Sequence, residues 1–509
     1  MKRFGLIALI ALACAIGGAA TTTSPSLAAP LFGGKKASPT PSPSPSVLPT
    51  ASPEPASVAI PRLIAKLKAN PSDQLAMAQL AAEYLQVNRP DITLQYTQHL
   101  LQMGDKTAQV YYYDGFAEEQ LGNATAATYD LEQASNLDPT NLGVLAQLSD
   151  VYIRENRFSD AERIAKRAVT FNKNEPGALM TLGSVYASEQ HYDDARAQFE
   201  AAFALNQKDV APLYQIATTY ADQDNIPMAV ATIQRALAID PRSVQALVFK
   251  ADLYARQHDD LRAAQAYDDA VVAAPTDDQK VAILIRKGSY FVQEKKEAQG
   301  QAIFQQIVNQ FPKVPAGFVA YGDYLAQQRQ YGPAVTQWRA ALALDPNNGG
   351  ALLGLGQVAM ATGKLSDSIS YFKHYTQVSP DAQGFALLGQ AYSRVHDYSG
   401  ARDACGKSFE IQRNPVTLGC VAGADFELRN YKEAAQIFDA LDRAAKGFLD
   451  QNPTLLYIAA RSYAGSNQCT KAVAAYKRLL PMMKKGTSDY DKVRKSASDT
   501  CHAPAKHSG

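Results

Sequence analysis

The chain of 509 residues has no excess of charge of either sign, because 50 lysines and arginines face 49 acidic residues and the net charge is +1. Without a broad positive field, the sequence does not predict binding to nucleic acid or to an anionic membrane. Basic residues gather only in the C-terminal tail, where aspartates alternate with them, as on a solvated terminal helix.

Motifs for catalysis, metals and cofactors are also absent. The sequence has no phosphate-binding Gly-x4-Gly-Lys-Ser/Thr loop and no His-Glu-x2-His pair. A Gly-x-Gly-x2-Ala stretch at residues 354–359 resembles a dinucleotide fingerprint, but it lies inside a predicted helix with no strand before it. Five of the seven histidines are single and scattered. We therefore predict no catalytic residue, no metal and no cofactor.

The first 20 residues have the layout of a bacterial secretory signal peptide, with Lys2 and Arg3 before an apolar run that ends in small residues. Cleavage is expected after Ala20, or as late as Ala28. A retained anchor is one alternative, and a lipid on Cys14 is a less favoured second. The sequence thus predicts a periplasmic or secreted protein that meets the membrane only through this segment.

Residues 21–57 hold nine prolines among serines, threonines and alanines. Proline fixes φ and removes a backbone donor, and this segment has little apolar surface to bury. We predict a disordered, extended linker between the signal peptide and a folded region that begins at residue 58.

Three segments end an apolar stretch in nearly the same way: EQASNLDPTN at 132–141, RALAIDPRS at 235–243 and RAALALDPNN at 339–348. Proline disfavours helix at the residue before it, so each Asp-Pro predicts a helix end. The three prolines fit one register of 34 residues. With proline at position 32, the units begin at Gln74, Ala108, Leu142, Pro176, Val210 and Val244, and, after about three extra residues, near Val281, Pro315, Gly349, Ala382, Pro415 and Pro453.

Within the units, Leu179-x2-Leu182-Gly183-x2-Tyr186 is followed by Ala195-x3-Phe199. This pattern resembles the tetratricopeptide repeat, a helix–turn–helix unit. The resemblance implies an all-α solenoid of about twelve helical hairpins over residues 58–486, wound as a right-handed superhelix, with a lone capping helix near 57–71. Residues 487–509 are expected to form a C-terminal capping helix and a basic tail. The unit at Val281, with Gly300 in the alanine slot, and the last two units depart from the pattern.

Small residues are expected where the two helices of a hairpin approach closely. Glycines stand at position 8 of several units (Gly115, Gly183, Gly322, Gly356 and Gly389), and alanines stand at position 20 (Ala195, Ala229, Ala334, Ala434 and Ala472). A hairpin of this size cannot bury its own apolar face, so neighbouring hairpins must stack to complete the core.

The resemblance also implies where partners bind. In tetratricopeptide arrays the first helices line the concave face, and positions 2, 5, 9, 12 and 13 point there. The candidate partner-binding residues are Tyr112, Phe116, Asp150, Arg154, Met180, Tyr214, Asp252, Arg256 and Asp323. The lysine and asparagine of the carboxylate-clamp subfamily are missing. Apolar anchors beside Asp and Arg suit a mixed peptide or a helical segment.

The function predicted from these features is that of a non-enzymatic protein-interaction scaffold of the bacterial cell envelope, whose partners are other envelope proteins or peptides. One alternative is a repeat subunit of an envelope-assembly or polysaccharide- or protein-export machine. A second is an enzyme whose catalytic part carries no motif that we recognise.

The cysteines after Cys14 fall in the last quarter of the chain, at Cys405, Cys420, Cys469 and Cys501. Export to an oxidising compartment and the even count favour disulfides. Cys405 and Cys420 are equally far from a predicted turn near 412–413, and Cys469 and Cys501 flank a turn near 480–486. A metal site of Cys469, Cys501, His502 and His507, and a buried free thiol at Cys405, are the alternatives.

Non-reducing peptide mapping of protein taken from cells should recover Cys405–Cys420 and Cys469–Cys501. The second bridge would close a loop of about 32 residues, worth roughly 3–4 kcal/mol in the chain-entropy picture, and would hold the terminal helix in place. Recovery of a Cys405–Cys469 pair would contradict the pairing, and recovery of four free thiols would contradict the pairing and weaken the argument that these cysteines reflect export.

Overall fold

The computed structural model describes residues 54–499. The predicted signal peptide, its cleavage sites, Cys14 and nearly all of the predicted linker lie outside these residues, as do Cys501 and the rest of the chain after residue 499. Within the described range every regular element is a helix, and none of these helices is long and apolar enough to cross a membrane. The predicted all-α fold of stacked hairpins is therefore confirmed.

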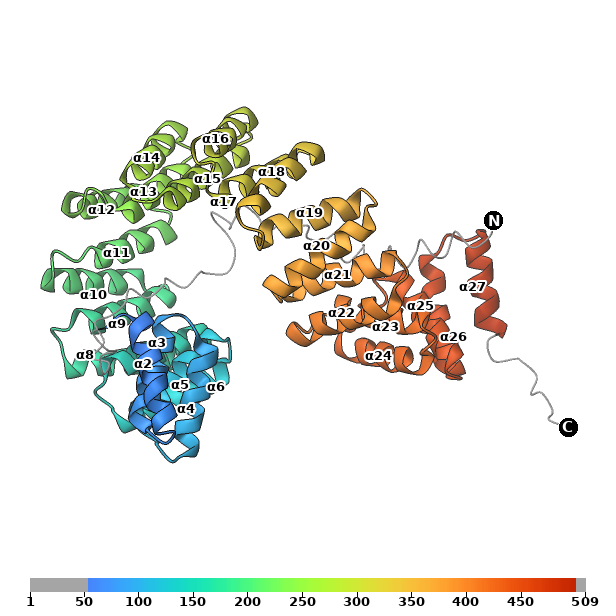
Figure 1. The fold of residues 1–509 in the computed structure, drawn as a ribbon, viewed down its shortest axis with the longest axis horizontal. Coiled ribbons are helices and arrows are strands. Elements are labelled where there is room, and N and C mark those ends of the chain that lie inside the picture. Colours follow the sequence, from blue (N-terminus) through green and yellow to red (C-terminus); the bar gives the residue numbers. More distant parts are fainter. Residues whose placement is uncertain (1–53, 500–509) are drawn as a thin grey trace. The chain divides into compact units, whose positions relative to one another are not determined.

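The described chain divides into two compact units, which meet in sequence between Ala274 and Pro275. The first contains one single helix and six hairpins (Figure 1). Its helices are α2 (Ala56–Ala69), α3 (Gln74–Gln86), α4 (Pro90–Gln102), α5 (Ala108–Gln120), α6 (Ala124–Leu137), α7 (Leu142–Arg154), α8 (Phe158–Phe171), α9 (Pro176–Ser188), α10 (Tyr192–Leu205), α11 (Ala211–Asp222), α12 (Ile226–Ile239), α13 (Val244–Arg256) and α14 (Asp260–Ala273).

The second unit contains six further hairpins and a terminal helix. Its helices are α15 (Asp277–Gln293), α16 (Glu297–Gln310), α17 (Pro315–Gln327), α18 (Tyr331–Leu344), α19 (Gly349–Ala361), α20 (Leu365–Val378), α21 (Ala382–Arg394), α22 (Tyr398–Ile411), α23 (Pro415–Glu427), α24 (Tyr431–Ala444), α25 (Pro453–Gly465), α26 (Cys469–Leu479), the short 3-10 helix η1 (Leu480–Met482) and α27 (Ser488–Asp499).

The hairpins begin where the 34-residue register places them, with two differences. α11 begins at Ala211 rather than Val210, which precedes it as the N-cap residue. α15 begins at Asp277, four residues before the predicted start at Val281, because the extra residues lengthen the first helix by one turn. The Thr276 side chain caps this added turn by accepting from the backbone N–H of Gln279. At the N-terminus, α2 starts at Ala56, inside the segment predicted as linker.

The recurring Asp-Pro segments end one helix and start the next. α6, α12 and α18 each end at the residue before the aspartate. The last residue of each segment then caps the following helix: Asn141 accepts from the N–H of Val144, Ser243 from Ala246 and Asn348 from Ala351. Each repeated segment therefore forms the whole connection between two hairpins: it ends one helix and supplies the N-cap residue of the next.

Inside each hairpin, position 8 of the first helix meets position 24 of the second. A Cβ atom on Gly183 would lie 2.5 Å from the ring of Phe199, and one on Gly356 would lie 2.5 Å from Phe372. Phe199 and Phe372 are fully buried. The five alanines at position 20 are also fully buried. The predicted close approach of the two helices is thus confirmed.

The hairpin of α15 and α16 has a second glycine at position 20, where nine of the other hairpins have alanine and the remaining two have Thr93 and Ser368. A Cβ on Gly300 would lie 2.5 Å from a methyl carbon of Val292 and 3.1 Å from the carbonyl oxygen of Gly288. The departure from the alanine pattern therefore has a steric reason, because a methyl group on Gly300 would overlap the Val292 side chain.

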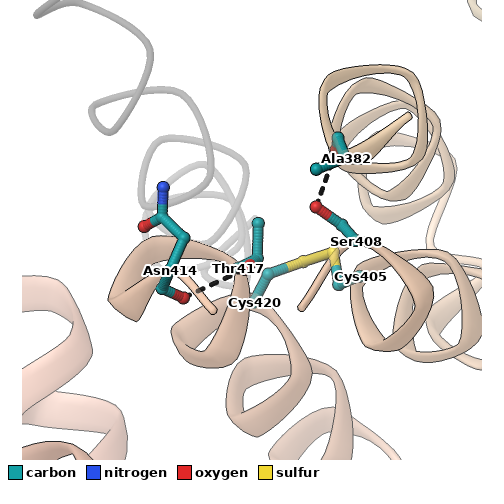
Figure 2. The surroundings of a disulfide bond; sticks show 6 residues. All are labelled: Ala382, Cys405, Ser408, Asn414, Thr417 and Cys420. Carbon is teal, nitrogen blue, oxygen red and sulfur yellow. Dashed lines mark hydrogen bonds between the residues drawn. A yellow bond between two sulfur atoms is a disulfide. The ribbon is translucent and has the colours of Figure 1, made fainter. Parts of the chain in front are cut away.

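One boundary between hairpins is fastened twice. Cys405 of α22 and Cys420 of α23 form a disulfide with an S–S distance of 2.14 Å and Cα atoms 6.1 Å apart (Figure 2). Near it, the Arg402 guanidinium donates to Asp425 at 2.7 Å, and the Asp425 side chain is almost completely buried. Ser408 of α22 also donates to the backbone oxygen of Ala382 at 2.7 Å, which ties this helix to α21.

At the C-terminal end, α27 covers the last hairpin. Val493 is buried in the same apolar cluster as Tyr476 and Leu479 of α26. Cys469 is the first residue of α26. Because Cys501 lies outside the described residues, the Cys469–Cys501 bridge stays a prediction.

Replacing Gly356 with alanine should destabilise the array by about 1–3 kcal/mol, because the new methyl group must displace the fully buried Phe372 ring. Gly406 in α22 is the matched control, since a Cβ there meets no atom within 4 Å. Gly406→Ala should be neutral or stabilising by up to about 1 kcal/mol, because alanine is the better helix former. Urea unfolding followed by circular dichroism measures both effects, and an equal loss in the two variants would contradict the close-contact account.

Candidate functional site

We define the first-helix surface as the side chains at positions 2, 5, 9, 12 and 13 of each hairpin. In residues 54–274, α5 contacts α7, α7 contacts α9 and α9 contacts α11, so these first helices form a continuous row. Eight of the nine candidate partner-binding residues lie in this compact unit. Asp323, in α17, belongs to the other unit.

Tyr112 and Phe116 stack on each other along α5, with ring centroids 6.1 Å apart and planes within 3° of parallel. Phe116 is half-buried, whereas Tyr112 is only 8% exposed and belongs to the core cluster of this unit. Burial raises the pKa of Tyr112 to about 12. Tyr112 is therefore less open than its position in the repeat predicts, and its hydroxyl is largely removed from water.

The arginines at position 13 bind the preceding hairpin. Arg154 forms an ion pair with Glu119, which also accepts from the side-chain amide of Gln147. Arg256 donates to the backbone oxygen of Ala221 at 2.8 Å and to Asp224 at 3.1 Å. These contacts fasten adjacent first helices to each other, a role that the repeat register alone does not predict.

The aspartates at position 9 differ according to the residue that faces them at position 24. Tyr267 donates its hydroxyl to Asp252 at 2.7 Å, and the Trp338 indole donates to Asp323 at 3.0 Å. The carboxylates of Asp252 and Asp323 thus form hydrogen bonds inside their own hairpins. The sequence contains a pattern that could have predicted these hydrogen bonds: an aspartate is followed 15 residues later by an aromatic residue with a donor group.

Asp150 occupies the same position 9 in α7, but position 24 of its hairpin is Ala165, which has no donor. Within residues 54–499, the Asp150 side chain has no hydrogen bond and no ion pair. Burial raises its pKa to about 7, although the residue is not closed off from solvent. It lies close enough to Tyr112 for its charge to disfavour ionisation of that hydroxyl.

Met180 and Tyr214 are the position-5 residues of α9 and α11. Both are partly buried and pack against the apolar clusters below the surface. The Tyr214 hydroxyl bonds to the Ser243 hydroxyl at 2.8 Å, and burial raises the pKa of Tyr214. Both side chains are therefore packed in place and remain partly exposed, so a partner can contact them.

The sequence analysis missed a buried pair of carboxyl groups, Asp114 of α5 and Asp130 of α6. They are 5% and 7% exposed, and the Thr97 hydroxyl donates to Asp114. Burial raises both pKa values, and the neighbouring Asp114 charge raises that of Asp130 further, to about 7. The pair can therefore share one proton at neutral pH.

The described residues contain no group of three or more His, Cys, Asp or Glu side chains that could hold a metal ion. The glycines at 354 and 356 lie inside α19, where Gly354 packs on Trp338 and Gly356 on Phe372. A shallow cavity of about 480 Å³ opens at the hairpin turns of α11–α14. Its lining residues are Asp224, Ile226, Pro227, Arg256, Gln257, Asp259 and Arg262. Its four charged side chains are paired with one another, as Arg256–Asp224 and Arg262–Asp259.

Two family models match parts of the chain. Residues 95–247 match the family described as the tetratricopeptide repeat protein 21 C-terminal ARM domain, and residues 319–382 match the tetratricopeptide repeat family. No curated protein sequence matches the chain.

Among solved structures, YrrB, described as a TPR protein with an unusual peptide-binding site, is 23% identical, with a TM-score of 0.30, over 36% of this chain and 95% of its own. The Cut9–Hcn1 hetero-tetramer of APC/C is 13% identical, with a TM-score of 0.34, over 87% of this chain and 93% of its own.

Asp130→Asn should stabilise the protein at pH 8 and change little at pH 4. A carboxyl group whose folded pKa is raised from 3.8 to about 7 holds its proton in the folded state, so stability is highest at low pH and falls as pH rises through about 7. The loss between these limits is up to roughly 4 kcal/mol, and asparagine removes it. Thermal melts of both proteins at pH 4 and pH 8 measure the difference, and an equal difference at the two pH values would refute the shared proton.

Proposed function

We propose that this chain, which is a tetratricopeptide-repeat protein, is a non-enzymatic scaffold of the bacterial cell envelope that binds peptide or helical segments of partner proteins. The proposed binding site is the first-helix surface of residues 108–256. One observation carries the proposal: Phe116 and Asp150 are partly exposed beside Tyr112, and within residues 54–499 the Asp150 side chain has no hydrogen bond and no ion pair.

The surface is suited to binding because it is formed before a partner arrives. The helices that present it are held by buried contacts within each hairpin, such as that between Gly183 and Phe199, and by the arginine contacts between hairpins. Binding to a rigid surface avoids the entropy cost of ordering it. A partner segment would place apolar side chains against Phe116, Met180 and Tyr214 and a polar group at Asp150.

The envelope location rests on the N-terminal sequence, where a signal-type segment precedes a proline-rich linker. The disulfide between Cys405 and Cys420 is consistent with an oxidising compartment, since disulfides are rare in the cytosol. In this arrangement the linker separates the array from the point of export and leaves the first-helix surface accessible to other envelope proteins.

Phe116→Ala should weaken the binding of a partner captured from envelope extract by about 2 kcal/mol or more, as expected for a central aromatic anchor. Tyr214→Ala should also weaken binding. Tyr112 is tested by Tyr112→Phe rather than by alanine, because its ring is buried in the core. Val272→Ala is the matched control, because Val272 is 85% exposed on the second helix α14. Dissociation constants from surface-based binding assays compare the variants. Wild-type affinity in both Phe116→Ala and Tyr214→Ala would place the site elsewhere.

A further inference from the structure

Asp150 differs from the other position-9 aspartates in having no donor to satisfy it. Asp252 accepts from Tyr267 and Asp323 accepts from Trp338, each across one hairpin. Ala165 stands at the corresponding place opposite Asp150, and no other side chain of the described residues replaces the missing donor. A largely desolvated carboxylate without a donor is costly, so an incoming donor at this point gains more than it would at an exposed aspartate.

The groups around Asp150 define which donor fits. The Tyr112 hydroxyl lies near it, and within residues 54–499 this hydroxyl also has no hydrogen-bond partner. The rings of Tyr112 and Phe116 are parallel and form an aromatic wall along α5. On the other side, Arg154 is the nearest cation on α7, four residues away, but its guanidinium is held by Glu119.

The charges near the site favour a cation. Glu119 and Arg154 neutralise each other, so an ionised Asp150 leaves this part of the surface with one net negative charge. A planar guanidinium can stack on an aromatic face while it donates two hydrogen bonds to a carboxylate, whereas an ammonium ion is a more strongly hydrated point charge. An aromatic wall beside a carboxylate therefore suits arginine better than lysine.

We propose that Asp150, Tyr112 and Phe116 form a subsite that binds the guanidinium of an arginine side chain on the partner segment. This inference rests on the proposed function and names the chemistry of its partner. The guanidinium would donate to the Asp150 carboxylate, its plane would lie against the Phe116 ring, and the Tyr112 hydroxyl would accept a further N–H.

The test is a carbon-13 NMR titration of the mature chain labelled at the aspartate carboxyl carbons, with the Asp150 signal assigned by its loss in Asp150→Asn. Alone, this carboxyl should titrate near pH 7. Saturating Nα-acetyl-arginine amide should lower its midpoint by about one pH unit, which corresponds to a roughly tenfold preference for the ionised form. The neutral isostere Nα-acetyl-citrulline amide should leave the midpoint unchanged.

Asp252→Asn is the matched control, because it makes the same chemical change at the same repeat position, where the carboxylate already accepts from Tyr267. The arginine probe should shift Asp150 in this variant as in wild type. No shift with arginine amide, or the same shift with citrulline amide, would overturn the subsite. An equal shift with Nα-acetyl-lysine amide would overturn the assignment to arginine.

Because the probe is a small molecule, these results do not depend on the partner assay. If Phe116→Ala loses partner binding but arginine amide does not shift the Asp150 midpoint, the scaffold function is supported and the subsite is rejected.

Discussion

The contact between position 8 of one helix and position 24 of the next supports the rest of this structure. Where position 8 is glycine, the helices approach until a large side chain, such as Phe199 or Phe372, lies directly on the glycine backbone. This contact brings the two helices of such a hairpin close together, and the hairpins stack because a single hairpin cannot bury its own apolar face. The row of first helices is a product of the same constraint, which leaves their outer positions available for partners.

The residue at position 24 also determines whether the polar side chain at position 9 has a hydrogen-bond donor inside its own hairpin. Tyrosine and tryptophan there engage Asp252 and Asp323 from within the hairpin. Alanine at 165 leaves Asp150 without a donor, and cysteine at 405 replaces the buried aromatic group with a disulfide to the next hairpin. One packing position thus gives structural aspartates in some repeats, a candidate binding group in another and a covalent link in a third.

Much of this architecture follows from the sequence, because a 34-residue period repeats the same local rules of helix ending, capping and close packing. Ten of the twelve predicted hairpin starts match helix starts, among them Ala108 and Pro453. The extra turn of α15 was missed because an insertion can lengthen either a loop or a helix. The depth of Tyr112, the contacts of Arg256 and the pairing of Asp114 with Asp130 depend on neighbouring helices, whose side-chain geometry a repeat register does not specify.

The central claim is that partners bind the first helices of residues 108–256. The most direct test is amide hydrogen exchange of the mature chain, measured by mass spectrometry. The chain is compared alone and in complex with a partner that was purified by binding to it. The account predicts that the partner slows exchange in the first helices α5, α7, α9, α11 and α13 and leaves the second helices between them unchanged. Protection confined to the second helices, or to residues 275–499, would contradict it.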